Sequence, residues 1–153
     1  MHAENLELAR KQLGEDHLYV LRIRVAQARL DTVNGNPARA DAALVDLIAR
    51  LRKQGPNGVA ALAQAIVARG DALLAQRRTA EAIPLLTEGL HLRESYLWDQ
   101  SWELAIARER LGEALGRNDP RGKELLHKAL SVFESQLGPE NRQTQRVRRL
   151  VGT

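Results

Sequence analysis

The sequence predicts an all-α protein, an α-solenoid of helix-turn-helix repeats that forms one domain over residues 1–153. First, small residues recur at equal intervals: Ala28, Gly70 and Gly112. Second, an Ala-Leu pair recurs at the same interval, as Ala40 with Leu44 and as Ala82 with Leu86. A period of about 40 residues built from paired helices is typical of helical repeat arrays. An up-and-down helical bundle is the alternative, but the fixed period favours the array.

The first element is a helix over residues 3–13, in which Leu6, Ala9 and Leu13 have helical spacing. Gly14 suits the left-handed residue that follows a helix, and Asp16 suits the N-cap of the next one. We expect residues 3–16 to be a partial repeat, the second helix of a pair whose first helix is missing.

The first complete repeat is expected over residues 17–55. Its first helix, about 17–33, has an apolar face made of Leu18, Leu21, Val25, Ala28 and Thr32. Its second helix, about 37–53, begins with Pro37 in its first turn and is expected to bury Ala40, Leu44, Leu47, Ile48 and Leu51. The turn at 54–58 contains Gly55, Pro56 and Gly58 and separates this repeat from the next.

The later elements follow the same pattern. Repeat two covers 56–98 (helices 59–76 and 79–96), repeat three covers 99–139 (helices 101–115 and 121–136), and a terminal segment covers 140–153 (helix 142–150). Thr79 is the expected cap of its helix, and Pro84 lies near the start of the same helix, where proline costs less than in the middle.

The composition indicates closely packed helices without disulfide bonds. Apolar residues are mostly Ala and Leu, aromatic residues make up 3% of the chain, and there is no cysteine. No N-terminal signal-peptide pattern is present, and the most apolar run, 59–68, is shorter than the roughly 20 residues of a spanning helix. We therefore expect a soluble, cytoplasmic protein.

The net charge of +4 belongs to the C-terminal segment. Residues 142–153 contain four arginines and no acid, so the rest of the chain is balanced: Arg142, Arg146, Arg148 and Arg149. Sequence-independent phosphate binding needs a basic stripe along a domain, which makes nucleic acid an unlikely partner for the body. The alternative function is that the basic tail, through Arg142, Arg146 and Arg149, binds nucleic acid or an acidic partner. The other interpretation of this tail is that its arginines form the outer surface of a capping helix.

No catalytic or metal-binding motif stands out, so we expect no enzymatic activity, no cofactor and no metal site. The histidines form no close ligand set, and no phosphate-binding loop or nucleophile elbow is present. Glu109 and Glu113 share a helix face, flanked by Arg110 and Arg117. Like charges at this spacing indicate a solvated face or an acidic patch, and a catalytic dyad would require burial.

Tyr96, Trp98 and Trp102 form the one aromatic cluster, at the boundary between repeats two and three. Packing between repeats is one interpretation. The other is that Trp98 and Trp102 form an exposed anchor for a partner, because Trp and Tyr dominate binding hot spots.

These residues resemble the tetratricopeptide repeat (TPR) family, in its longer 42-residue, kinesin light-chain-like form. Gly70, Leu73, Ala82 and Leu86 match the family pattern, and Leu111-Gly112 with Leu115 match it again. The fragment 82–86 (AIPLL) and the corners 13–17 (LGEDH) and 137–141 (LGPEN) are also similar to that form. Such repeats resemble those that follow bacterial signalling kinases and regulators.

The resemblance implies a right-handed superhelix that serves as a protein–protein interaction scaffold, and a regulatory part of a larger signalling protein is one such role. A concave groove lined by the first helix of each repeat would bind a peptide or helix of a partner. The implied groove residues are Arg22, Val25, Ala26, Arg29, Gln64, Val67, Ala68, Asp71, Leu74, Ile106, Glu109, Arg110, Glu113 and Arg117. The partner would be a protein, with no membrane, and the chain would be a monomer or a homodimer through its terminal helices.

Overall fold

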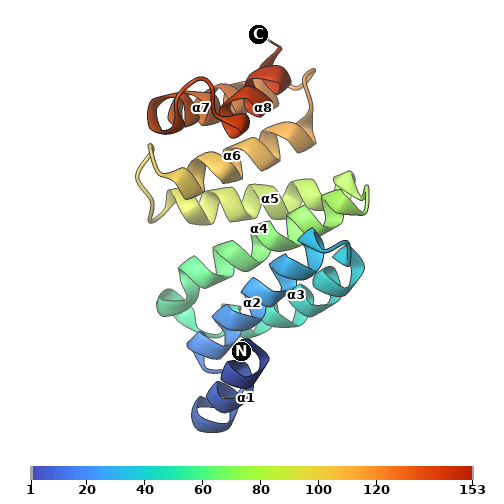
Figure 1. Ribbon diagram of the computed structural model, residues 1–153, viewed down its shortest axis with the longest axis vertical. Coiled ribbons are helices and arrows are strands. Elements are labelled where there is room, and N and C mark those ends of the chain that lie inside the picture. Colours follow the sequence, from blue (N-terminus) through green and yellow to red (C-terminus); the bar gives the residue numbers. More distant parts are fainter. Residues whose placement is uncertain (1, 153) are drawn as a thin grey trace. The chain divides into compact units, whose positions relative to one another are not determined.

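The computed structural model describes the backbone of residues 2–152 and the side chains of residues 6–152. The described part is all-helical and contains no strand. Its elements, in chain order, are α1 (His2–Leu13), α2 (Leu18–Val33), α3 (Pro37–Arg52), the 3-10 turn η1 (Gly55–Gly58), α4 (Val59–Ala75), α5 (Thr79–Glu94), α6 (Trp102–Leu115), α7 (Pro120–Leu137) and α8 (Arg142–Val151). Each expected helix is present, with ends that differ from the expectation by one or two residues (Figure 1).

The chain forms two compact units, Met1–Arg78 and Thr79–Thr153. The division falls between α4 and α5, inside the span expected for repeat two. The first unit therefore holds α1 to α4, and the second holds α5 to α8.

In the first unit, α2 and α3 form a helical hairpin, and α4 packs against both of them. The hairpin turns at Gly35, and Pro37 begins α3 as expected. The expected apolar faces are confirmed, since these side chains are buried: Leu21, Val25, Ala28, Ala40, Leu44, Leu47, Ile48 and Leu51. Leu18 and Thr32 are half-buried at the edge of this core.

The segment Gly55–Ala75 is long and apolar enough to span a membrane by length and composition alone. It extends beyond the apolar run at 59–68 because alanine and leucine continue to residue 75. In the structure, 56% of its apolar stretch is buried, and a core helix of a soluble protein can have the same length and composition. The position of α4 against α2 and α3 is that of a core helix.

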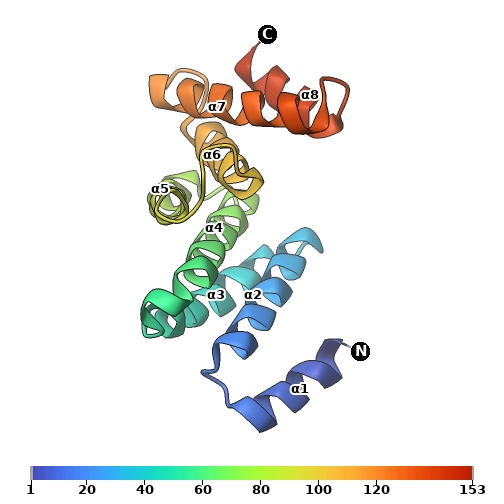
Figure 2. The same ribbon diagram turned by 90° about the vertical axis from the view of Figure 1, so that its left-hand side faces the viewer.

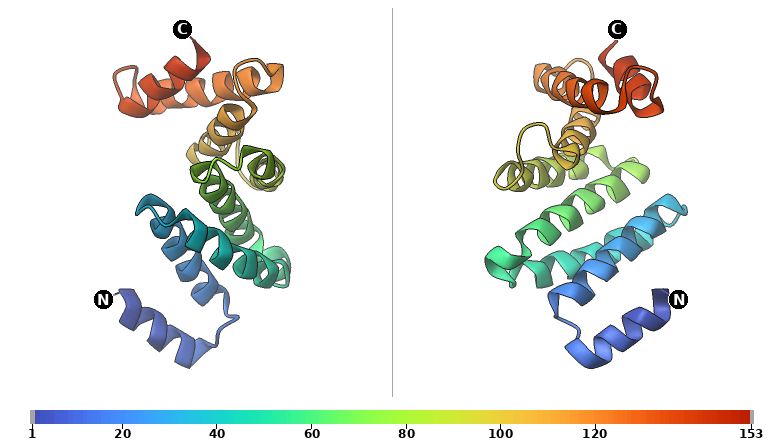
Figure 3. Two further views of the ribbon diagram at one scale, coloured as in Figure 1. Left: turned by 90° about the vertical axis from the view of Figure 1, so that its right-hand side faces the viewer. Right: turned by 60° about the vertical axis from the view of Figure 1, so that its left-hand side comes forward.

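The helix α1 meets α2 near the corner at residues 14–17 and diverges from it beyond (Figures 2 and 3). Gly14 has a φ of +87° and donates its N–H to the Arg10 carbonyl, which confirms its expected role. The expected cap was wrong: His17, not Asp16, caps α2, and its Nδ1 accepts from the Tyr19 N–H at 3.2 Å. Asp16 instead accepts from Arg50 Nη1 of α3 at 2.9 Å.

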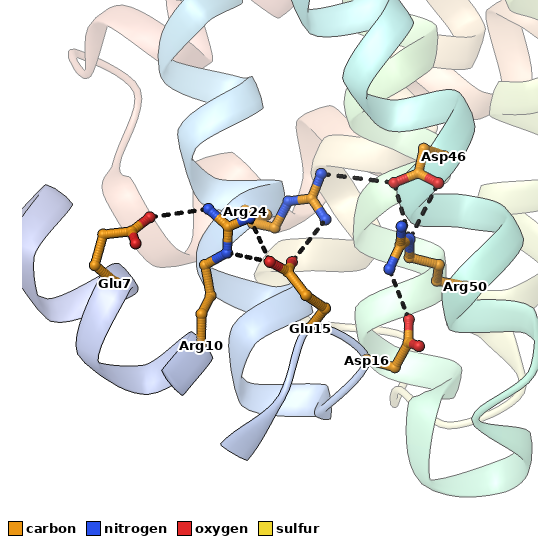
Figure 4. Close-up of polar contacts among 7 residues, drawn as sticks. All are labelled: Glu7, Arg10, Glu15, Asp16, Arg24, Asp46 and Arg50. Carbon is orange, nitrogen blue, oxygen red and sulfur yellow. Dashed lines mark hydrogen bonds and ion pairs between the residues drawn. The ribbon is translucent and has the colours of Figure 1, made fainter. Parts of the chain in front are cut away.

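A chain of ion pairs links α1, the corner, α2 and α3 (Figure 4). Arg10 bonds Glu7 and Glu15, Arg24 lies between Glu15 and Asp46, and Arg50 bonds Asp46 and Asp16. The hydrogen bonds that Arg10 donates to Glu15 and that Arg50 donates to Asp46 raise the pKa of the two arginines. All these groups are at least partly exposed, so each pair adds little stability, although the pairs together hold the corner in place.

In the second unit, consecutive helices pack on one another, and the core lies between α6, α7 and α8. The buried cluster is Ala105, Leu126, Ala129, Leu130, Val132, Phe133 and Val147. The Trp102 ring packs edge-on against Phe133, with ring centroids 4.9 Å apart. Asn141 caps α8 after a corner at Gly138, whose φ of +82° repeats that of Gly14.

Two glycines lie where α6 and α7 pack closely, Gly112 of α6 and Gly122 of α7. A Cβ on Gly122 would lie 2.7 Å from the Gly116 carbonyl oxygen and 3.1 Å from that of Gly112. A Cβ on Gly112 would lie 2.8 Å from Leu126 Cγ. For this pair of helices, the close contact therefore requires small residues, and one of them, Gly112, belongs to the recurring set of the sequence.

Candidate partner-binding surfaces

The outer face of α2 is an exposed stripe of apolar and basic residues. When α2 is projected along its axis, these residues lie within an arc of about 100°: Tyr19, Arg22, Ala26, Arg29, Leu30 and Val33. Tyr19 is 54% exposed, and Val33 is 82% exposed. We call these six residues the α2 stripe.

The two arginines of the α2 stripe have no acidic partner. Arg22 and Arg29 are exposed and form no ion pair or side-chain hydrogen bond among residues 6–152. By contrast, Arg24, on another side of the same helix, lies 3.5 Å from Asp46 and 3.8 Å from Glu15. The stripe contains no acid and is therefore a positively charged surface with apolar side chains between its charges.

Three expected groove residues of α2 and α4 are not on a surface. Val25, Val67 and Ala68 are buried, because Val25 faces the α2–α3–α4 core and the other two lie on an almost wholly buried part of α4. The remaining expected residues of α4, Gln64, Asp71 and Leu74, are half-buried. On α4, the buried stretch from Ala63 to Ala68 leaves few side chains for contact with a partner.

On α6, the expected acidic pair does not form a solvated face. The Glu109 side chain is 0% exposed and accepts hydrogen bonds from Arg146 and Gln143 of α8. Arg146 also bonds Glu113 at 2.6 Å, and Arg110 lies 3.9 Å from Glu109. The buried carboxylate is neutralised by an arginine, so this arrangement is an internal ion-pair cluster.

The helix α8 is anchored to the second unit by apolar as well as polar contacts. Val147 is fully buried in the core, and the buried Thr144 hydroxyl donates to the Phe133 carbonyl at 3.3 Å. Arg117 donates to the Arg149 carbonyl at 2.9 Å, and Arg148 bonds Glu134 at 2.6 Å. Thus α8 contacts three of the groove residues expected in repeat three: Glu109 and Glu113 of α6, and Arg117 of the turn that follows α6.

The basic tail divides into paired and unpaired arginines. Arg146 and Arg148 bond carboxylates, whereas the exposed guanidinium groups of Arg142 and Arg149 have no partner among residues 6–152. A surface hollow of about 540 Å³ lies along this side of α8, lined by Asn141, Arg142, Gln143, Gln145, Arg146 and Arg149. Two of the four arginines are therefore available to an anion.

The aromatic residues do not form one surface. Trp102 begins α6 and packs into the core, whereas Trp98 lies in the preceding turn and is 68% exposed. Burial raises the pKa of Tyr96, which is still partly exposed. Of the two tryptophans expected as an anchor, Trp98 is exposed, whereas Trp102 packs against the core of the second unit.

Among residues 6–152, no group of His, Asp and Glu side chains is placed to hold a metal ion. Arg108 is buried and bonds the carboxylate and carbonyl of Asp99, and Arg93 bonds the Glu103 carbonyl. The Arg108–Asp99 contacts join the loop between α5 and α6 to α6, and the Arg93–Glu103 contact joins α5 to α6 at the ends of that loop. Their role in the described structure is to close that loop.

No protein-family model matches the chain, and no curated protein matches it with significant similarity. The TPR resemblance therefore rests on the motifs and spacing given above.

Proposed function

We propose that this chain is a TPR-like α-solenoid that acts as a non-catalytic protein-binding module. Its binding surface is the α2 stripe, which binds a segment of a partner protein. The observation that carries the proposal is the pair of unpartnered arginines, Arg22 and Arg29, on an exposed face that also presents Tyr19, Leu30 and Val33.

The composition of the stripe supports protein binding. Tyr and Arg are enriched in binding hot spots, and exposed apolar residues gathered on one face favour an interface over a solvated surface. On α6, by contrast, Glu109 and Glu113 are bonded to Arg146 of α8. The helix α8 would have to detach before these carboxylates could bind a partner. The proposal therefore places recognition on α2 rather than along all the first helices.

The charges of the stripe define the partner. Arg22 and Arg29 are two helical turns apart, about 10 Å along α2. A segment with two carboxylates at a matching distance and apolar residues between them would pair with both arginines. Electrostatic complementarity of this kind sets specificity and association rate more than affinity.

Affinity capture from nuclease-treated lysate tests the proposal. Wild type is compared with Arg22→Glu/Arg29→Glu and with Lys53→Glu/Lys123→Glu, a control with the same charge change at two other exposed positions. We expect a discrete protein that wild type and the control retain and that the α2 variant loses. Equal retention by all three proteins would rule out the α2 stripe as the binding surface.

A second candidate function is anion binding by α8, favoured by the hollow with the unpaired Arg142 and Arg149. A nucleic-acid ligand would show binding that falls steeply with salt. The test variant is Arg142→Gln/Arg149→Gln, because deletion of α8 would remove Val147 from the core. If lysate without nuclease yields RNA or DNA that this variant loses, while no protein is retained after nuclease, α8 is the site.

A further inference from the structure

The exposed residues of α2 repeat with the spacing of a coiled-coil seam. All of them belong to the α2 stripe, and five follow one another at intervals of three, four, three and four residues: Tyr19, Arg22, Ala26, Arg29 and Val33. Intervals that average 3.5 residues keep side chains in one row along a helix, so a second helix can follow the row over several turns. We call these five residues the heptad row.

The heptad row is accessible over most of α2. From Tyr19 to Val33 it covers about 21 Å of helix axis. The helix α1 packs against Val20 and Ile23, which lie on the neighbouring side of α2, and leaves the row exposed. The row therefore offers a partner four helical turns of continuous surface.

The separation of the two arginines favours a helical partner over an extended one. Arg22 and Arg29 are about 10 Å apart along α2. On a partner helix, two carboxylates seven residues apart have the same separation and point in nearly the same direction. On an extended strand, side chains that point the same way are about 6.6 Å or 13 Å apart. Only one of two such carboxylates would lie level with its arginine.

The charges and sizes along the heptad row define the chemistry of that helix. Arg22 and Arg29 form no ion pair or side-chain hydrogen bond among residues 6–152, and the row contains no acid. Ala26 lies between the two arginines, and its small side chain lets a helix approach closely with one large residue facing it. A second copy of α2 would bring arginine next to arginine, so charge disfavours self-association through this row.

We infer that the α2 stripe binds one acidic α-helix of the partner protein, packed along α2 as in a two-stranded coiled coil. The inference rests on the proposed function and adds the conformation and register of the partner segment. That helix carries acidic residues seven positions apart, with a large aliphatic residue midway between them. Its carboxylates pair with Arg22 and Arg29, and its aliphatic side chain contacts Ala26.

The probes are two displayed libraries selected on the full wild-type chain. One contains single helices with randomised outward positions, and the other contains extended peptides whose regularly spaced prolines prevent helix formation. We expect enrichment from the helical library alone, of peptides with two acids seven residues apart around one large aliphatic residue. Moving the second acid from the seventh to the fifth following position turns it by about 160° around the helix and should weaken binding at least tenfold.

Variants of the chain test the register. Ala26→Phe should bind the enriched peptides at least tenfold more weakly than wild type, whereas Ala42→Phe, the same change at an exposed position of α3, should bind them as wild type does. Arg22→Glu/Arg29→Glu should lose the acidic peptides and bind versions in which lysine replaces both acids. This exchange of partners also shows that the variant is folded.

Enrichment of proline-containing peptides, of basic peptides or of none would each overturn the inference, as would equal binding to Ala26→Phe and Ala42→Phe. The proposed function fails separately, through lysate capture that survives Arg22→Glu/Arg29→Glu. Capture that depends on these arginines, together with extended peptides as the enriched class, would keep the function and remove the helix from it.

Discussion

Arg146 of α8 bonds Glu109 of α6, a carboxylate with no exposed surface. Burial of a charge is costly unless a partner neutralises it, and removal of one member of a buried pair typically costs 3–5 kcal/mol. The partly exposed Arg146 also bonds Glu113, so one guanidinium serves two carboxylates. The contact fixes α8 on α6 and decides which charges of the second unit are available to a partner.

Arg146→Ala is expected to lower the free energy of unfolding of the second unit by about 3 kcal/mol, since it leaves Glu109 buried without its arginine. Glu109→Gln/Arg146→Met should cost less than Arg146→Ala, because no unpaired charge remains. Urea unfolding followed by circular dichroism measures both. Arg148→Ala, which breaks the more exposed pair with Glu134, is the control and should cost less than about 1 kcal/mol. Equal losses for all three variants would contradict this account of the pair.

Gly122→Val is expected to destabilise the contact between α6 and α7 by about 3 kcal/mol. The added Cβ would meet the carbonyl oxygens of Gly116 and Gly112, which are backbone atoms and yield only if the helices separate. Lys123→Val places the same residue at the adjacent exposed position and should cost about 0.5 kcal/mol through helix propensity. Thermal unfolding compares the two variants, and a tolerated Gly122→Val would show that the helices are not in close contact there.

Asp119 should make stability depend on pH at the acid end. Its side chain caps α7, and hydrogen bonds from Arg121 lower its pKa from 3.8 to about 2. A folded-state pKa below the unfolded one gives stability that is present above pH 4 and is lost as the pH falls toward 2. Asp119→Asn keeps a capping oxygen that does not titrate, so its unfolding midpoint should fall less between pH 4 and pH 2 than that of wild type. Parallel pH profiles for the two proteins would contradict the assignment.

The two tryptophans should differ in accessibility. In Trp102→Phe, the remaining Trp98 is 68% exposed and should show red-shifted fluorescence that iodide quenches strongly. In Trp98→Phe, the remaining Trp102 packs on Phe133 and should be blue-shifted and poorly quenched. Similar quenching constants for the two variants would mean that the turn at Trp98 or the Trp102–Phe133 contact is wrong.

Much of the fold was predictable because it follows from local patterns. The apolar spacing in residues 17–53, Gly14 at the corner and Pro37 at the start of α3 each determine structure through neighbours in sequence. The failures come from contacts distant in sequence. Asp16 does not cap α2 because Arg50 binds it, and Glu109 is not solvated because α8, more than 30 residues later, covers it.

The candidate site was predictable in part. The exposed arginines Arg22 and Arg29 were expected on the partner-facing side, and the structure places both on the surface. Val25 was expected both in the apolar face of its helix and in the groove. Its side chain is buried, so it belongs to the apolar face and not to a groove. A hollow between α2 and α3, next to Leu30, had no sequence signal, because its shape depends on how the two helices pack. The solenoid, the partner and the function stay predictions.

Hydrogen exchange of the chain with and without its captured protein partner tests the central claim most directly. The account predicts added protection centred on residues 18–33, little change at 142–151, and loss of the effect in Arg22→Glu/Arg29→Glu. Protection confined to α8, or an unchanged footprint in the variant, would contradict recognition by the α2 stripe.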